Sequence, residues 1–158
     1  MNILVLCTGN SARSILLESI FNTLGADRTR AFSAGSNPTG KVHPQSLALL
    51  GELGHDTSSA LSKSWDEFAA EDAPQMDIVI TVCASAAGET CPIWPGAPVR
   101  THWGVEDPAA ADQPEWDQAF RTAYATLEKR AKALLELPFE TMNATELSRQ
   151  LKQIGEIV

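Results

Sequence analysis

Short continuous apolar runs alternate along the chain with longer segments in which apolar residues recur every three or four positions. The run over residues 3–6 is typical of a strand buried on both faces, and residues 77–82 form the clearest strand pattern in the chain. Two further strands are predicted over residues 31–34 and, after a loop rich in Gly, Pro and Ala, over residues 99–103. The longer segments predict helices over residues 14–24, 44–53 and 116–137, and a short helix over residues 62–70 that Ser62 or Ser64 caps. This alternation predicts a doubly wound α/β fold, in which helices flank a four-stranded parallel sheet.

Two prolines mark boundaries in this pattern. Pro44 suits the first position of a helix, and Pro138 ends the long one. Beyond Pro138, the apolar residues of segment 141–154 share one helical face, so this tail either packs back or pairs with another subunit. We therefore expect one domain over residues 1–138 and a C-terminal helical tail over residues 139–158.

Composition excludes some partners. The chain has 158 residues, of which 44% are hydrophobic and 20% charged, and this is typical of one globular domain. A net charge of -8 gives no basic field to recruit nucleic acid or an anionic membrane. Met1 leads straight into an apolar strand and no apolar run is long enough to span a membrane, so we expect a cytoplasmic protein.

One polar segment follows the first predicted strand at once. It reads Cys-Thr-Gly-Asn-Ser-Ala-Arg-Ser over residues 7–14 and opens the first helix. Gly9 and Asn10 allow the backbone to turn its N–H groups inward, and the helix start adds a positive dipole end, so both features favour an anion. The predicted oxyanion-binding residues are Thr8, Gly9, Asn10, Ser11, Ala12, Arg13 and Ser14.

Cys7 and Arg13 are the predicted nucleophile and its partner. Their spacing lets the loop close, so that the planar guanidinium lies across the anion from the sulfur and binds two oxygens. The helix start and Arg13 are expected to lower the pKa of Cys7. Ser14 can donate to the Cys7 sulfur, cap the helix or do both, and Asn10 either shapes the loop or is a mere turn residue. The competing interpretation is a buried structural cysteine beside a surface arginine.

A displacement at Cys7 needs a general acid, and Asp107 is the predicted one. It precedes Pro108 in a rigid loop and can aim its carboxyl at a leaving oxygen. Because Asp-Pro is also a common turn opener, spacing alone leaves catalysis and turn formation open. Glu106 is the second candidate acid, whereas His102 is more typical of a hydrogen-bonded structural histidine.

The three cysteines of the chain favour redox or nucleophilic work over structural disulfides. Cys83 directly follows the third predicted strand, and Cys91 lies further along the loop that begins there. A disulfide needs Cα atoms within roughly 7 Å, so these two thiols can pair only if the loop folds back. Otherwise they are two unrelated buried thiols. The sequence contains no paired CxxC units, and we predict no metal site.

Several segments together resemble the arsenate reductases that share the fold of low-molecular-weight tyrosine phosphatases. The resemblance spans residues 2 to about 137 and rests on segments 5–14, 33–38, 42–44, 81–83, 91–92 and 102–109. It implies that the Cys7 thiolate attacks the arsenic of arsenate, with phosphate and sulfate as analogues. The loop and Arg13 hold the oxyanion, and Asp107 protonates the departing hydroxyl.

The resemblance also implies a thiol relay. Cys83 attacks the Cys7 sulfur, arsenite leaves, and Cys91 takes over the disulfide. An external reductant, thioredoxin or glutathione with glutaredoxin, then resets the enzyme, which binds no cofactor of its own. This chain departs from relatives in having Ala12 where many have a second loop cysteine. The loop between Cys83 and Cys91 is about one residue longer than in thioredoxin-coupled members, which leaves room for the glutathione route.

A further departure concerns a potassium site of some relatives. Its ligands resemble Asn10, Glu18 and Ser33, but Lys63 stands where a carboxylate would complete it. The lysine ammonium is therefore expected to replace the cation.

Two other functions compete with this interpretation. A phosphatase would use the same Cys7, Arg13 and Asp107, with water attacking the intermediate in place of Cys83. The Asp-Pro-Ala-Ala sequence at residues 107–110 lacks the aromatic residues with which the phosphatases usually grip an aryl ring. A non-enzymatic anion sensor is the other alternative, and a general acid argues against it.

Overall fold

The sheet has four parallel strands, as the apolar runs predict. The computed structural model describes residues 1–83, 86, 88, 94 and 96–158. The strands are β1 (Asn2–Leu6), β2 (Arg30–Ala34), β3 (Ile78–Thr81) and β4 (Val99–His102), in the order β2-β1-β3-β4. In the register of the sheet, Leu6 lies opposite Thr81, which in turn lies opposite His102. The carboxyl ends of β1, β3 and β4 therefore meet at one end of the sheet.

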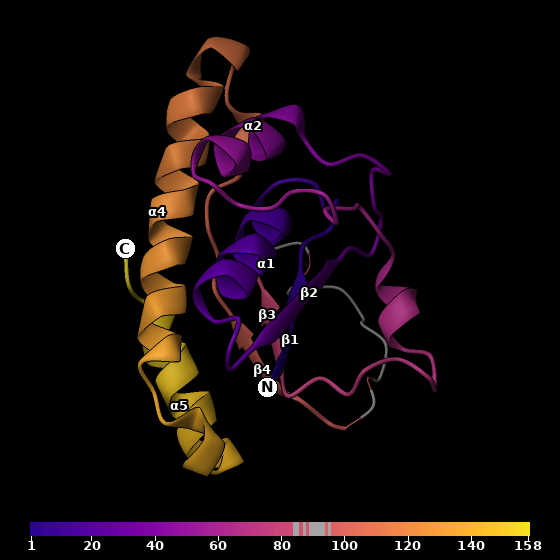
Figure 1. The fold of residues 1–158 in the computed structure, drawn as a ribbon, viewed down its shortest axis with the longest axis vertical. Helices are drawn as coiled ribbons and strands as arrows, with labels where there is room; N and C mark the ends of the chain where they lie inside the picture. Colours follow the sequence, from indigo (N-terminus) through magenta and orange to yellow (C-terminus); the bar gives the residue numbers. More distant parts are fainter. Residues whose placement is uncertain (84–85, 87, 89–93, 95) are drawn as a thin grey trace.

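The central strands β1 and β3 are buried on both faces, whereas β4 at the edge is partly exposed. Ile3 and Val5 of β1 enter a large core beneath helices α1 (Arg13–Leu24), α4 (Trp116–Leu135) and α5 (Ala144–Ile154). Leu4 and Leu6 enter a smaller core on the other face, with Trp94 and the 3₁₀ helix η1 (Trp65–Phe68). Figure 1 shows α4 and α5 along the left side of the sheet. Burial on both faces explains the lack of polar alternation in β1 and β3, whereas exposed residues alternate with half-buried ones in β4.

The predicted helices lie where expected, with small differences at their ends. Helix α1 begins at Arg13, one residue earlier than predicted, and its end is capped at Gly25, whose N–H donates to Phe21 O at 2.8 Å. Helix α2 (Pro44–Glu52) and helix α4 end one and two residues early. The apolar pattern continues past the last helical turn of both, so periodicity overestimates their length.

Segment 62–70 forms only one turn, the 3₁₀ helix η1. Ser64 caps it by accepting from Asp66 N at 3.2 Å. Just before this turn the backbone bonds to the end of β2, where Gly35 donates to Lys63 O and accepts from Trp65 N. These bonds hold the chain extended up to Trp65, so a longer helix cannot form.

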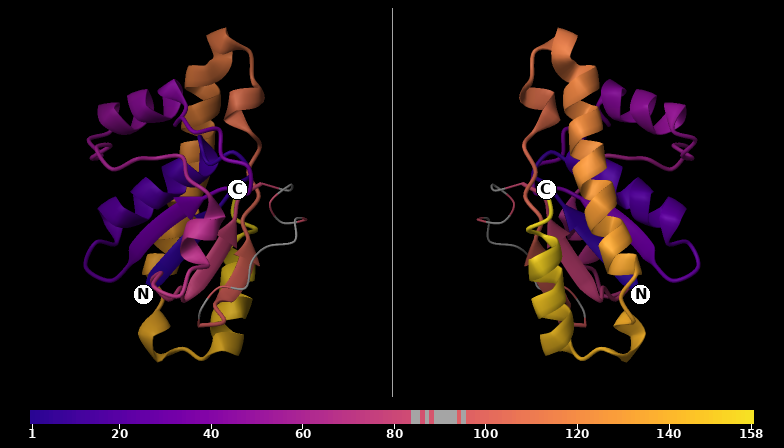
Figure 2. Two further views of the ribbon diagram at one scale, coloured as in Figure 1. Left: turned by 90° about the vertical axis from the view of Figure 1, so that its right-hand side faces the viewer. Right: turned by 90° about the vertical axis from the view of Figure 1, so that its left-hand side faces the viewer.

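The C-terminal tail packs back on the domain. Helix α5 lies against β4 and α4 (Figure 2), and its apolar residues Leu147, Leu151 and Ile154 are part of the large core. The indole N–H of Trp103 donates to Leu151 O at 2.9 Å and joins the helix to the end of β4. The short helices η2 (Pro108–Ala110), η3 (Gln113–Glu115) and η4 (Phe139–Thr141) were not predicted. In the described part of the chain, no helix is both long and apolar enough to cross a membrane.

Candidate active site

Cys7 and Cys83 meet beyond the carboxyl ends of β1 and β3. Each thiol is free and buried, and the two side chains are hydrogen-bonded to each other. The backbone N–H of Thr8 donates to Cys83 Sγ at 3.4 Å, and the Thr8 hydroxyl lies 3.7 Å from the same sulfur. The predicted convergence of these two loops is confirmed. Cys91, the other predicted redox thiol, lies outside the described residues.

The loop after β1 turns its carbonyl groups outward. Three of them accept backbone N–H groups from the surrounding chain at 3.0 Å: Thr8 O from Asn37, Gly9 O from Thr39, and Ser11 O from His43. The C=O and N–H of a trans peptide point in opposite directions, so the next N–H along the chain points into the loop. These inward N–H groups belong to Gly9, Asn10 and Ala12. Together with the Thr8 N–H and the start of α1 they make up the loop predicted to bind an oxyanion, called the cradle below.

Asn10 shapes the loop, as one of the two interpretations predicted. Its backbone is left-handed, with φ of 46°, and the residue is fully buried. Its Oδ1 accepts from Lys63 N at 2.8 Å, and its Nδ2 donates to Ser14 Oγ at 2.9 Å. Ser14 lies inside α1 after Ala12, so it does not cap the helix. Within the described residues its hydroxyl contacts Asn10, not Cys7.

Gly35, at the end of β2, is needed for the shape of this loop and was missed from the sequence. A Cβ atom there would lie 2.4 Å from Thr8 O and 2.7 Å from Cys7 O, closer than packed atoms approach. Only glycine lets β2 come this near to the loop backbone. The signal was present, because Gly35 lies inside segment 33–38, on which part of the family resemblance rests.

The prediction of a lowered Cys7 pKa is wrong for the free protein. The hydrogen bond with Cys83 raises the pKa of Cys7, burial raises it further, and Arg13 opposes both. The same hydrogen bond, together with the Thr8 N–H, lowers the pKa of Cys83 to about 5 although burial opposes it. Of the two sulfurs, Cys83 is therefore the one whose surroundings favour the thiolate in the free protein.

Arg13 and Asp107 face each other across the mouth of the loop. Arg13 Nη2 lies 3.5 Å from Asp107 Oδ2, and its Nη1 donates to Val105 O at 3.0 Å. Arg13 Nε is buried and has no hydrogen-bond partner among the described residues, so this donor is available to an oxyanion. Asp107 Oδ1 accepts from Ala109 N at 3.0 Å and caps η2. Turn formation thus uses Oδ1 of Asp107. Its Oδ2 is left to serve the other predicted role, that of general acid.

The other candidate acids take no part in this contact. Glu106 is exposed, and the described residues give it no ion pair with Arg13. His102 bonds through Nδ1 to the Thr81 hydroxyl at 2.7 Å, which confirms the interpretation of a structural histidine.

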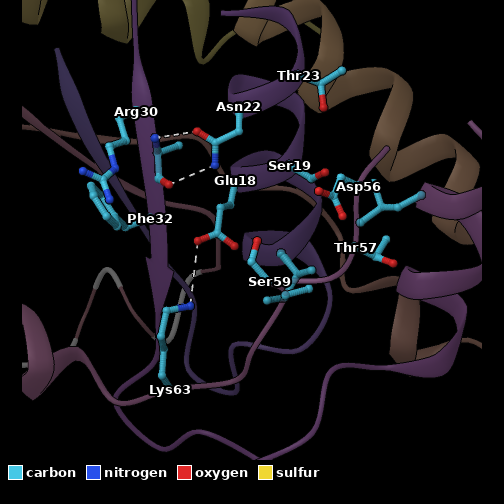
Figure 3. A pocket seen from close by; sticks show the side chains of 14 residues that line it. Glu18, Ser19, Asn22, Thr23, Arg30, Phe32, Asp56, Thr57, Ser59 and Lys63 are labelled. Atoms are coloured by element: carbon cyan, nitrogen blue, oxygen red, sulfur yellow. Dashed lines mark hydrogen bonds and ion pairs between the residues drawn. The ribbon is translucent and has the colours of Figure 1, made fainter. Parts of the chain in front are cut away.

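Behind the loop, Glu18 of α1 points toward Lys63 beside a cavity of about 490 Å³ (Figure 3). Their charged atoms are 3.8 Å apart, and both side chains are mostly buried. Burial raises the pKa of Glu18 and the Lys63 ammonium opposes this. Lys63 lies beside the loop because its backbone N–H bonds to Asn10. That its ammonium replaces a cation stays a prediction.

A cysteine in a loop closed by an arginine, at the end of a four-stranded parallel sheet, is the arrangement expected of enzymes that transfer an oxyanion group to cysteine. Among the residues that the structure describes, no His, Cys, Asp and Glu side chains group to hold a metal ion. The chain belongs to the low molecular weight phosphotyrosine protein phosphatase family, whose model matches residues 2–153.

Its relatives within that family include arsenate reductases. An arsenate reductase of Halalkalibacterium halodurans is 36% identical over 134 residues, which cover 83% of this chain and 92% of that protein. A solved arsenate reductase in the phosphate binding state is 29% identical, with a TM-score of 0.67 over 85% of this chain and 95% of the other. A thioredoxin-dependent arsenate reductase of Corynebacterium glutamicum is 25% identical, with a TM-score of 0.61, over 83% of this chain and 60% of that one.

Proposed function

We propose that this protein reduces arsenate to arsenite. The observation that carries the proposal is the contact of Cys83 with both Cys7 and the Thr8 N–H of the cradle. A second thiol at this place has no role in ester hydrolysis, where water resolves the intermediate. It is where a resolving thiol must lie to attack the Cys7 sulfur.

The first step forms the bond between Cys7 and arsenic. Cys7 passes its proton to the Cys83 thiolate or to solvent, and its sulfur attacks arsenic(V) in the cradle. Arg13 turns its free Nε to the oxyanion and stabilises the charge. Asp107 Oδ2 protonates the departing oxygen, which leaves as water.

The second step is the reduction. A proton that Cys83 took from Cys7 passes on to solvent, and the Cys83 thiolate attacks the Cys7 sulfur and forms a disulfide. The electron pair of the sulfur–arsenic bond stays with arsenic, which leaves as arsenite in the +3 state. The two thiols are thereby oxidised by two electrons. We further propose that Cys91 exchanges into this disulfide and that thioredoxin, or glutathione with glutaredoxin, reduces it. Thiols of this kind need the reducing cytoplasm.

Single-turnover experiments without reductant test the proposal. Wild-type protein should release one arsenite and form a disulfide, found by mass mapping. Cys83→Ser should bind arsenate and form the adduct but release no arsenite, and Cys7→Ser should do neither. Cys91→Ser should release arsenite and keep a Cys7–Cys83 disulfide. Unchanged arsenite release in Cys83→Ser would contradict the relay, and efficient p-nitrophenyl phosphate hydrolysis that survives this substitution would favour a phosphatase.

A further inference from the structure

Two arginines hold the backbone that carries Asp107, from opposite sides. Arg13 Nη1 donates to Val105 O at 3.0 Å, from the side of the oxyanion loop. Arg130 Nη1 donates to Gly104 O at 3.2 Å, from α4. The two guanidinium groups therefore bind consecutive carbonyls, two and three residues before the proposed acid.

Arg130 carries a positive charge at a buried position, which is unusual. The residue is 4% exposed, burial lowers its pKa, and it has no ion-pair partner among the described residues. Its charge faces carbonyl oxygens instead: besides Gly104 O, its Nε donates to Ile157 O at 3.0 Å. An apolar residue of similar length would fill the same space without the cost of burying an unpaired charge. Stability alone thus does not account for an arginine here.

The C-terminal segment completes this support. Trp103 bonds to Leu151 O of α5, and a Cβ on Gly155 would lie only 3.1 Å from His102 O and 2.9 Å from Trp103. The end of α5 is thus pressed against the end of β4, and Ile157 follows two residues later. Arg130 lies between this end of the chain and Gly104, and it joins the two.

The role of Arg130 follows from what Arg13 has to do. In the free protein Arg13 binds Val105 O and faces Asp107. During turnover the same guanidinium must hold the oxyanion, which competes for its donors. The Val105 N–H bonds to Val82 O at 3.2 Å and ties the segment to the end of β3, but Arg130 is what holds it on the side of α4. That second contact matters because a misplaced acid transfers its proton slowly.

We propose that Arg130, with the backbone of Ile157, is a positioning residue that holds segment 104–107 so that Asp107 keeps its aim while Arg13 binds the oxyanion. The proposal rests on the proposed function of Asp107 as general acid. Arg130 touches no reacting atom. Its loss should therefore slow the chemical step and leave oxyanion binding nearly unchanged.

The test compares Arg130→Met with Lys129→Met. Lys129 is the preceding residue of α4 and is exposed, and its hydrogen bond within the described part of the chain goes to Val158 O at 3.5 Å. Arg130→Met should lower kcat for arsenate by about tenfold, less than the effect of losing a general acid altogether. The KM for arsenate and inhibition by phosphate should change less than about twofold. Arg130→Lys should restore part of kcat, and Lys129→Met should match the wild type.

Two further variants keep the test decisive. A chain ending at Glu156 removes the Ile157 carbonyl but keeps α5, and should also lose kcat and retain phosphate inhibition, even if Arg130→Met does not fold. In an Asp107→Asn background, Arg130→Met should cause no further loss, because it acts through the acid.

An unchanged kcat in Arg130→Met or in the shortened chain would overturn the inference, as would equal losses of kcat and phosphate affinity. If Asp107→Asn alone leaves turnover undiminished, the acid role in the proposed function is what fails, and the inference fails with it.

Discussion

The loop that carries Cys7 and the segment that carries Asp107 are held in place in different ways. The loop is fixed by backbone bonds to its outward carbonyls and by the fully buried Asn10. Asp107 keeps 42% of its side chain exposed, and its segment is gripped by guanidinium groups from distant parts of the chain. The cradle is thus formed once the protein folds. The acid segment is held in part by Arg13, for whose donors a bound oxyanion competes.

The largest expected effect breaks the loop itself. Gly35→Ala places a Cβ against the Cys7 and Thr8 carbonyls, so we expect a loss of about 2–4 kcal/mol in the free energy of unfolding, together with turnover. Gly51→Ala is the control, because nothing lies within 4 Å of its Cβ, and in helix α2 it should stabilise by roughly 0.5–1 kcal/mol. Urea denaturation and arsenate turnover measure both. Wild-type stability in Gly35→Ala would contradict the rigid loop.

A substitution of Asp107 should lower turnover without lowering the free energy of unfolding, whereas Gly35→Ala lowers both. Asp107→Asn should slow adduct formation by about a hundredfold. Asparagine still caps η2, so the free energy of unfolding should change by less than about 1 kcal/mol. Rapid-quench kinetics and urea denaturation check this, with Glu106→Gln as the control that keeps wild-type rates. A stability loss as large as that of Gly35→Ala would mean that the acid segment is not independently held.

The smallest expected effect is a shift in the pKa of Cys83 when its hydrogen bond with Cys7 is removed. With a Cys83 pKa of about 5 against an ordinary value of 9.0, the thiolate persists at neutral pH and is lost as pH falls through 5. Cys7→Ala removes its main hydrogen-bond donor, so the pKa of Cys83 should rise and the thiolate should disappear at higher pH. The ultraviolet absorbance of thiolate follows this titration. In a Cys91→Ser background, Cys7 and Cys83 are the remaining cysteines that contribute to this absorbance. An unshifted titration in Cys7→Ala would show that Cys7 does not donate a hydrogen bond to Cys83.

The features that could be predicted from the sequence are those set by residues close together in the chain. Strands buried on both faces and helices with a regular apolar face follow from periodicity, and the cysteine, arginine and glycine of the loop follow from their spacing. The partners of these residues could not be derived in the same way. Ser62 was predicted as a possible helix cap, but it donates to Gly9 O, because the bonds of Gly35 hold this part of the chain extended.

The remaining errors have one physical origin, which is contact between residues far apart in the chain. The pKa of Cys7 follows from the partner thiol, which lies in the loop after β3. Arg130 reads in the sequence as one more charge on an amphipathic helix. Its burial depends on how α5 folds over β4, and no spacing within α4 indicates that.

The contact of Cys83 with the Thr8 N–H has a consequence for affinity. In the free protein one donor of the cradle already serves an internal anion, so an incoming oxyanion must displace a thiolate as well as water. Measured binding then reports an exchange between two anions at one donor, and it is weaker than the cradle alone would give. The displaced sulfur remains tethered beside the adduct, at an effective concentration that no free thiol in solution can match.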